Sequence, residues 1–489
     1  MQRTIAVLLC ALLLFSGAVF PAAAADDAYT YPEPEVLEID LYIQPYHYLE
    51  MISGTDENKH PAIVCINGGE TQEIGIQVRG DSSLREGLET PGKRIPFELC
   101  FDYADASGNF RGNPSLKLIN CQTPARLLIQ YIAMLSYAFS GVPTPRITPA
   151  FIRINDTDFG LYLAVEDLNE AFVQDRFAGA SLYRPLAKQD TPAQTVPFEG
   201  GELLVKADHG NETVLRYADA RRRGENVDRY LDVDEILRFF ACETFLDNAD
   251  GFLSRSRNFY LADNNGKLSL LPWDTDYVFE TLSKGGEWSD FAQYDAPLFR
   301  YLMEDETNRL RYREYLRQLN DVFLNPETFL PWLESCIRTV SPYFQRDMTI
   351  DLRSQDVYAD LTSGAEVYNT QSGNLMLTFE VYHKLMRRML SGDTTSFSEL
   401  KEDAVASVKV KKARQKTRVS QPDRSVIARI CQHYWSLRRQ VFEREYGSQL
   451  LMCCGFFGLV FCVAVWSVRR HAGHKGKCAQ PKHGLSSNR

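Results

Sequence analysis

Acidic side chains gather in two short polar segments near the middle of the chain. Asp247 and Asp250 follow an apolar run, and Asp274 and Asp276 stand further on in a Trp-Asp-Thr-Asp sequence. Carboxylate and amide oxygens are the protein ligands that Mg²⁺ uses, together with water and substrate phosphates. Acid-rich loops also occur without any ligand, so the spacing alone leaves a solvated loop as an equal alternative.

The residues between these segments predict a β-hairpin that would bring both segments together. The turn sequence Asp-Asn-Asn-Gly at 263–266 separates two apolar runs. A helix that begins near Leu231, with Asp232 or Asp234 as its N-cap, leads into the first segment. If the hairpin forms, its two ends are neighbours, and several carboxylates converge with the amide of Asn258.

A second group of residues could bind phosphate. Residues 79–93 join two predicted strands and contain small residues flanked by Arg79 and Lys93. Backbone N–H groups and cations of this kind suit a phosphate, although an ordinary exposed loop has the same composition. Lys117 stands within the apolar strand 115–119. Kinases bind nucleotide phosphates with a lysine on a strand of this kind. The alternative is a lysine that simply faces solvent, which is the commoner case.

Both ends of the chain differ from its middle. Residues 1–25 predict a secretory signal peptide, with cleavage near Ala25. Residues 450–468 are apolar and uncharged, and a basic tail, 469–489, follows them. This pattern predicts a transmembrane helix with a cytoplasmic tail, hence a single-pass type I protein of the cell membrane with its main domain extracytoplasmic. A buried core helix is the weaker alternative.

Composition limits the possible partners and cross-links. The 489 residues carry a formal net charge of −10, which argues against a nucleic-acid partner. Six cysteines lie between the two ends: Cys65, Cys100, Cys121, Cys242, Cys336 and Cys431. Six cysteines allow fifteen pairings, and the sequence does not choose among them. Their spacing does not match that of cysteine zinc sites.

The order of predicted elements gives a fold class. Strands and one buried helix, opened by Pro124 and closed by Gly141, fill the first half, and mainly helices follow. This order predicts an α+β, bilobed, protein-kinase-like domain over 26–400, with a β-rich N-lobe (about 37–170) and a helical C-lobe (about 171–400). Nucleotide would bind between the lobes. A basic linker with a juxtamembrane helix, 401–448, would join this domain to the membrane helix.

Several motifs resemble the CotH (spore-coat protein H) family of atypical, secreted-type protein kinases. They cover about residues 70–280 and run in the family's order: VRGDSS, the strand that follows Lys93, SLKLI, FIRIND with GLYLAVEDL, SLYRPL, and FLDNADGFLSRSRNFYL with LPWDTDYVF. Beyond residue 280 only a helical pattern is shared.

The resemblance implies an enzyme that uses ATP with Mg²⁺ or Mn²⁺ and phosphorylates Ser or Thr of a protein substrate, expected to be rich in Ser. It implies these roles: Asp250 as the catalytic aspartate, Asp274 and Asn258 as metal ligands, and Arg79, Lys93 and Lys117 as nucleotide-binding cations. Residues 125–140 contain no acid. Glu166 is therefore expected to replace the usual glutamate partner of the phosphate-binding lysine.

Two other functions remain open at this level. The first is a catalytically inactive, kinase-like surface scaffold or adhesion protein, which would lack metal-dependent nucleotide binding. The second is a glycosidase with paired carboxylates. It is the weaker possibility, because Trp273 is the one aromatic residue that flanks a suitable acid.

Overall fold

The computed structural model describes residues 29–54, 58–177, 179–186, 194–210, 212–279, 294–352, 355–364 and 373–392. The chain divides into two compact units, 1–427 and 428–489, and all of these residues belong to the first unit. The predicted signal peptide, linker, membrane helix 450–468 and tail therefore lie outside the described residues.

The predicted membrane anchor needs correction. None of the helices in the described ranges combines the length and the apolar character that crossing a bilayer requires. The transmembrane part of the predicted fold class and the type I membrane localisation are therefore not supported.

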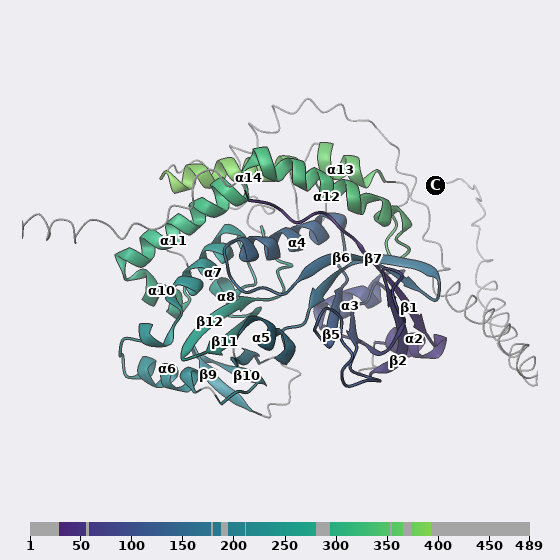
Figure 1. The fold of residues 1–489 in the computed structure, drawn as a ribbon. Helices are drawn as coiled ribbons and strands as arrows, with labels where there is room; N and C mark the ends of the chain where they lie inside the picture. Colours follow the sequence, from purple (N-terminus) through teal and green to yellow (C-terminus); the bar gives the residue numbers. More distant parts are fainter. Residues whose placement is uncertain are drawn as a thin grey trace, which may run out of the picture. The chain divides into compact units, whose positions relative to one another are not determined.

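Seven strands close into a barrel, which lies at the right of Figure 1. They are β1 (Leu37–Ile43), β2 (His60–Ile66), β3 (Gln72–Val78), β4 (Phe97–Cys100), β5 (Ser115–Ile119), β6 (Ile147–Ile154) and β7 (Thr157–Glu166). The order is β1-β2-β3-β4-β5-β7-β6, with antiparallel neighbours. Closure depends on the parallel pair β1–β6, in which Leu37 lies opposite Ala150. Strands β2 and β3 form an antiparallel hairpin, in which His60 lies opposite Ile76.

A second sheet of five strands contradicts the predicted helical C-lobe. Its strands are β8 (Ser181–Pro185), β9 (Thr195–Phe198), β10 (Gly201–Ala207), β11 (Phe259–Asn264) and β12 (Lys267–Pro272), in the order β12-β11-β8-β10-β9. The predicted hairpin is present as β11–β12, but β11 also pairs with β8, as in Leu261 opposite Tyr183. Local sequence pattern could not show this distant pairing, so the fold is a mixed α/β structure of barrel and sheet.

Most of the longer helices lie above both sheets in Figure 1, whereas the short helix Glu170–Arg176 packs on the opposite face of the second sheet. The longer ones are α4 (Pro124–Phe139), α6 (Thr213–Arg222), α7 (Val233–Phe245), α11 (Glu306–Gln318), α12 (Pro326–Arg346) and α14 (Leu375–Leu390). The shorter ones are α2 (Pro45–Met51), α3 (Ser82–Glu89), α5 (Glu170–Arg176), α8 (Phe252–Arg255), α10 (Pro297–Met303) and α13 (Val357–Ser363), with a 3-10 turn at Asp228–Tyr230 and a π turn at Leu319–Phe323.

The predicted buried helix that begins at Pro124 and the predicted helix that leads into the first acidic segment both form. The Thr123 side chain accepts a hydrogen bond from the backbone N–H of Arg126 at the start of α4, and Pro124 follows it. The Asp232 carboxylate accepts one from the N–H of Glu235 at the start of α7. These caps satisfy N–H groups that have no partner within the helix.

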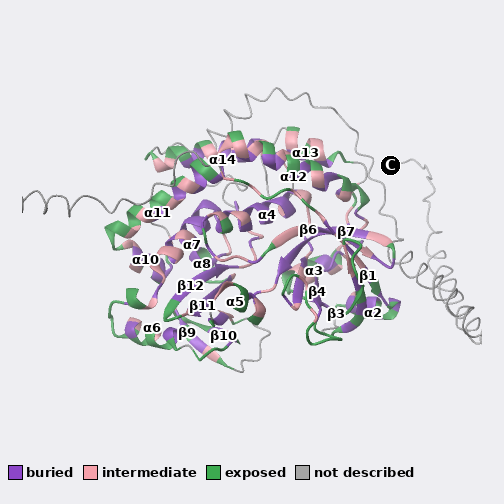
Figure 2. Cartoon of the chain, viewed as in Figure 1, coloured by how far each residue is buried: buried purple, intermediate pink, exposed green. Residues whose placement is uncertain are grey.

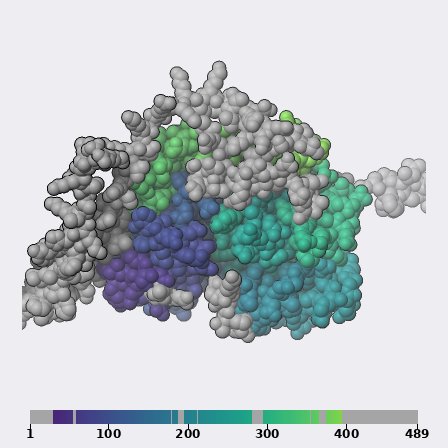
Figure 3. Space-filling view, turned by 180° about the vertical axis from the view of Figure 1, so that it is seen from behind, coloured from purple at the N-terminus to yellow at the C-terminus, as the bar shows by residue number. Residues whose placement is uncertain are grey.

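Burial follows these layers. The strands and the inner sides of the helices are largely buried, whereas exposed residues gather on outer helices and loops (Figure 2). Seen from behind, the blue residues of the barrel and the teal residues of the second sheet lie side by side (Figure 3). One continuous apolar core joins α4, α7, α11, α12 and α14.

A fully buried ion pair connects the barrel to the end of α12. The Arg94 guanidinium donates to Asp347 Oδ2 at 2.8 Å and to the Cys121 carbonyl at 2.8 Å. Asp347 Oδ2 also accepts from the Leu161 N–H of β7 at 2.9 Å. Both charges are fully buried and have several hydrogen-bond partners, the condition under which a buried pair is tolerated.

We expect Arg94→Met to lower the free energy of unfolding by about 3–5 kcal/mol, because it leaves the Asp347 carboxylate buried without its cation. Urea denaturation would measure this. The control is Lys384→Ala, which removes an exposed pair with Glu380 on α14 and should cost at most about 1 kcal/mol. Equal losses in both variants would contradict the structural role given to the buried pair.

Candidate active site

Backbone hydrogen bonds hold the two acidic loops together. The Ala249 N–H donates to the Tyr277 carbonyl at 2.9 Å, and the Phe279 N–H donates to the Leu246 carbonyl at 2.7 Å. The β11–β12 hairpin supports the same contact, since Phe259 lies opposite Pro272 at its open end. The structure thus brings the loop that carries Asp250 next to the loop that carries Asp274 and Asp276.

Three carboxylates share this place and repel one another. Burial raises the pKa of Asp274 to about 6, and the charge of Asp250 adds to the shift. Burial also raises the pKa of Asp276 to about 9; the charge of Asp274 adds to this, and the Arg126 guanidinium opposes it. Both residues are half-buried. A divalent cation would relieve the repulsion, and carboxylate oxygens are the type of ligand that Mg²⁺ or Mn²⁺ prefers.

Asn258 lies against Asp250. Its side-chain N–H₂ group donates to Asp250 Oδ2 and to the Asp250 carbonyl, each at 3.0 Å. The amide nitrogen is therefore engaged, and the amide oxygen is the atom that Asn258 can offer a cation. Asn258 and Asp274 both have left-handed backbone angles, with φ of 55° and 47°. Such angles are unfavourable outside glycine and occur often at functional sites.

Asp250 lies at the edge of this cluster. Its side chain is 19% exposed, and Arg257 and Arg255 approach its Oδ1 at 3.4 and 3.6 Å. Asp250 can therefore meet a group that arrives from solvent, while Asn258 fixes its orientation.

Glu243 of α7 fixes the loop that carries Asp250, and the sequence analysis missed it. Its buried carboxylate accepts from the Tyr137 hydroxyl at 2.6 Å, the Asn248 amide at 2.8 Å and the Leu253 N–H at 3.3 Å. A Cβ atom on Gly251 would lie 2.1 Å from Glu243 Oε2, so any larger residue there would displace the Glu243 carboxylate. An acid within the otherwise apolar end of a helix was the signal that could have identified Glu243.

Lys117 is paired, but not with Glu166 as predicted. Its Nζ lies 3.1 Å from Glu98 Oε1 and 3.2 Å from Asp167 Oδ1. In the β5–β7 pair Lys117 lies opposite Val165, and Leu116 lies opposite Glu166. Opposite residues share one face of a sheet and successive residues alternate, so Glu166 points to the other face.

Glu98 also brings Arg79 to this cluster. The Arg79 Nε–H donates to Glu98 Oε2 at 2.8 Å, and the Ser115 hydroxyl donates to Oε1 at 2.8 Å. Burial alone would raise the pKa of Glu98, but the charge of Lys117 and these hydrogen bonds outweigh it and lower that pKa. A lone acid inside the apolar strand Phe-Glu-Leu-Cys was the available signal for this residue.

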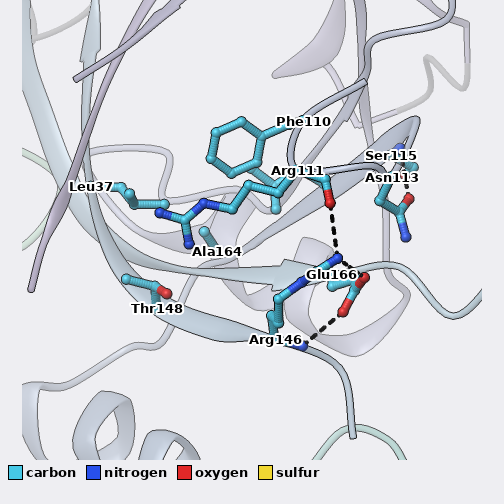
Figure 4. A pocket seen from close by; sticks show the side chains of 10 residues that line it. Leu37, Phe110, Arg111, Asn113, Ser115, Arg146, Thr148, Ala164 and Glu166 are labelled. Carbon is cyan, nitrogen blue, oxygen red and sulfur yellow. Dashed lines mark hydrogen bonds and ion pairs between the residues drawn. The ribbon is translucent and has the colours of Figure 1, made fainter. Parts of the chain in front are cut away.

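Glu166 belongs to a separate ion cluster with arginines. Its carboxylate binds Arg146 at 2.6 Å and Arg176 at 2.9 Å. Figure 4 shows Glu166 and Arg146 beside a small cavity that Arg111 also lines. The cavity holds about 20 Å³, room for about one water molecule. Ligand pockets usually enclose about 300–1,000 Å³, so this cavity cannot accept a nucleotide.

The predicted phosphate loop is largely helical. Helix α3 lies between Arg79 and Lys93 in the chain. The helix packs on the domain because Leu84 and Leu88 are spaced to face inward and Gly87 lies directly on the Arg94 backbone. The Lys93 ammonium donates to the Leu88 carbonyl at the end of α3. The structure therefore places Arg79 beside Lys117 but does not bring Lys93 to them.

Helices α3 and α4 both approach the second acidic loop. The Arg126 guanidinium of α4 lies 5.4 Å from the centre of the Tyr277 ring. The charge of Glu86 on α3 contributes to the raised pKa of Tyr277, after burial and the charge of Asp276. The acidic loop is thus bordered by elements that follow the barrel strands β3 and β5.

We expect Asp276→Asn to stabilise the metal-free protein at pH 8 and to flatten its pH dependence. An aspartate with a raised pKa stabilises fully below its unfolded value of 3.8 and loses this contribution as pH rises through its folded value near 9. Thermal denaturation in chelator should show wild type weakening from pH 5 to 9, and the variant melting roughly 2–4 °C higher at pH 8.

Asp219→Asn is the matched control, because this acid on α6 is 52% exposed and lies outside the cluster. It should keep the wild-type pH dependence. If Asp276→Asn also keeps the wild-type pH dependence, the raised pKa of Asp276 does not limit the stability of the protein.

Comparison with known proteins supports a kinase-like identity. A family model described as "CotH kinase protein" matches residues 76–370. Inner spore coat protein H of Bacillus subtilis (strain 168) is 20% identical over 327 residues, which cover 63% of this chain and 87% of that protein.

A solved structure, the Helicobacter pylori proinflammatory kinase CtkA, is 11% identical and covers 64% of this chain and 94% of its own, with a TM-score of 0.24. So low a score does not establish a shared fold, and the fold described above stands on its own. The family match spans more than half of the 489 residues, and this chain therefore belongs to the CotH kinase family.

Proposed function

We propose that this protein is a metal-dependent protein kinase that transfers the γ-phosphoryl group of ATP to a Ser or Thr hydroxyl of a protein substrate. The observation that carries the proposal is the convergence of Asp250, Asp274 and Asp276 in one partly buried place, with raised pKa values for Asp274 and Asp276. Carboxylates crowded together lower the stability of the protein. Such groups with raised pKa values are found most often at functional sites, and a bound cation would offset their repulsion.

Asp250 and Asp274 have distinct roles in the proposal. Asp250, which reaches solvent and is oriented by Asn258, accepts the proton of the substrate hydroxyl as its oxygen attacks the γ-phosphorus. The bond from phosphorus to the bridging oxygen breaks, and ADP leaves. Asp274 and the amide oxygen of Asn258 would hold Mg²⁺ or Mn²⁺. The bound ion would neutralise phosphate charge.

The cations of the barrel would bind the nucleotide phosphates. Lys117 and Arg79 are held side by side by Glu98, which resembles the paired lysine and glutamate of kinases in its chemistry. Lys93 and Glu166 were assigned to the same task by the family resemblance. Their contacts with Leu88 and with Arg146 and Arg176 favour structural roles, so the proposal does not use them.

The test is phosphate transfer from labelled ATP, with Mg²⁺ or Mn²⁺, to the protein itself or to a Ser-rich protein. Asp274→Asn should lower the rate at least about 100-fold by removing a metal ligand, and Asp250→Asn should lower it about 100- to 10,000-fold by removing the base. Asp219→Asn should stay within about twofold of wild type, because its carboxylate pairs with Arg222 on the surface.

Nucleotide binding separates this proposal from its main alternative. A kinase should show metal-dependent ATP binding that Asp274→Asn weakens. An inactive scaffold would show neither transfer nor that dependence. Full transfer by a correctly folded Asp274→Asn variant would refute the proposal.

A further inference from the structure

Two histidines and a glutamate form a compact cluster on the barrel, away from the acidic loops. His47 and Glu50 lie on α2, and His60 begins β2. One potential ligand atom from each lies within 4.8 Å of the other two. Both elements lie at the right of Figure 1, whereas β11 and β12 lie at its left.

Hydrogen bonds between Glu50 and the two histidines do not explain this arrangement. Oε2 of Glu50 lies 3.5 Å from His47 Nδ1 and 4.0 Å from His60 Nδ1, and both distances are long for hydrogen bonds. Nδ1 of His47 is buried and has no hydrogen-bond partner. A buried polar atom without a partner is costly, so its orientation toward Glu50 calls for an explanation.

The spacing suits a metal ion with nitrogen and oxygen ligands. Zn²⁺ binds His nitrogen and carboxylate oxygen at about 2.0–2.2 Å, which separates two ligand atoms of a tetrahedron by about 3.4 Å. The His47–Glu50 distance of 3.5 Å already fits this value. The Glu50 side chain is 52% exposed and can move the half ångström or so that the second distance requires.

The histidine rings are positioned in advance. Their centroids lie 4.4 Å apart, and both residues are more than nine-tenths buried. The Tyr46 ring packs 3.9 Å from the His47 ring on another side. Two fixed imidazoles and one movable, solvent-facing carboxylate form a preorganised three-ligand site in which water can supply a fourth ligand.

We propose that His47, Glu50 and His60 bind a divalent transition-metal ion of the zinc class. The ion would cross-link α2 to the start of β2. Its ligands are nitrogen-rich, unlike the oxygen donors at Asp274, so it would prefer Zn²⁺ over Mg²⁺. This site is independent of the proposed phosphotransfer.

The test is Zn²⁺ titration of the metal-free full-length protein, followed by calorimetry and by hydrogen exchange of peptides that cover residues 45–66. We expect Zn²⁺, but not Mg²⁺, to protect these peptides. Glu50→Gln should weaken the Zn²⁺ equivalent linked to this protection at least about tenfold. It should not impair folding, because its side chain is half exposed.

His47→Asn should have the same or a larger effect on this protection. His209→Asn is the control, since this histidine pairs with Glu170 outside the cluster. Absence of Zn²⁺-dependent protection in wild type, or equal protection in Glu50→Gln and wild type, would overturn the proposal. Binding elsewhere on the chain would not protect residues 45–66, so it would count against the site as well.

Discussion

Mutual repulsion among three carboxylates is the constraint on which the candidate site depends. Asp250, Asp274 and Asp276 cannot all be charged at low cost unless a cation joins them. Two backbone hydrogen bonds and the β11–β12 hairpin nevertheless hold their loops together. The surrounding structure therefore supplies the free energy that keeps this unfavourable arrangement in place.

Much of that support comes from buried polar groups rather than from apolar packing alone. Glu243 gathers three donors from α4, the acidic loop and α8, and Gly251 leaves the space that this contact needs. On the barrel, Glu98 does the same for Lys117 and Arg79. In both places a buried acid organises a neighbouring functional group that keeps part of its surface open to solvent.

The sequence predicted what local signals determine. The β11–β12 hairpin, the start of α4 at Pro124 and the N-cap of α7, which is Asp232 of the two candidates, depend on residues a few positions apart, and all three were predicted. Barrel closure through β1 and β6 and the pairing of β8 with β11 depend on distant segments, and neither was predicted. The expected pairing of Glu166 with Lys117 failed for a related reason. The register of β5 and β7 places the two side chains on opposite faces of the sheet.

The Arg94–Asp347 pair has a consequence for how this protein can change over evolution. Each residue is tolerable in the interior only while the other is present, so the two positions must be inherited and replaced together. A homologue that lacked the end of α12 would leave the Arg94 guanidinium buried without a counter-charge. We therefore expect the barrel and α12 to be inherited together, rather than the barrel being exchanged as an independent domain.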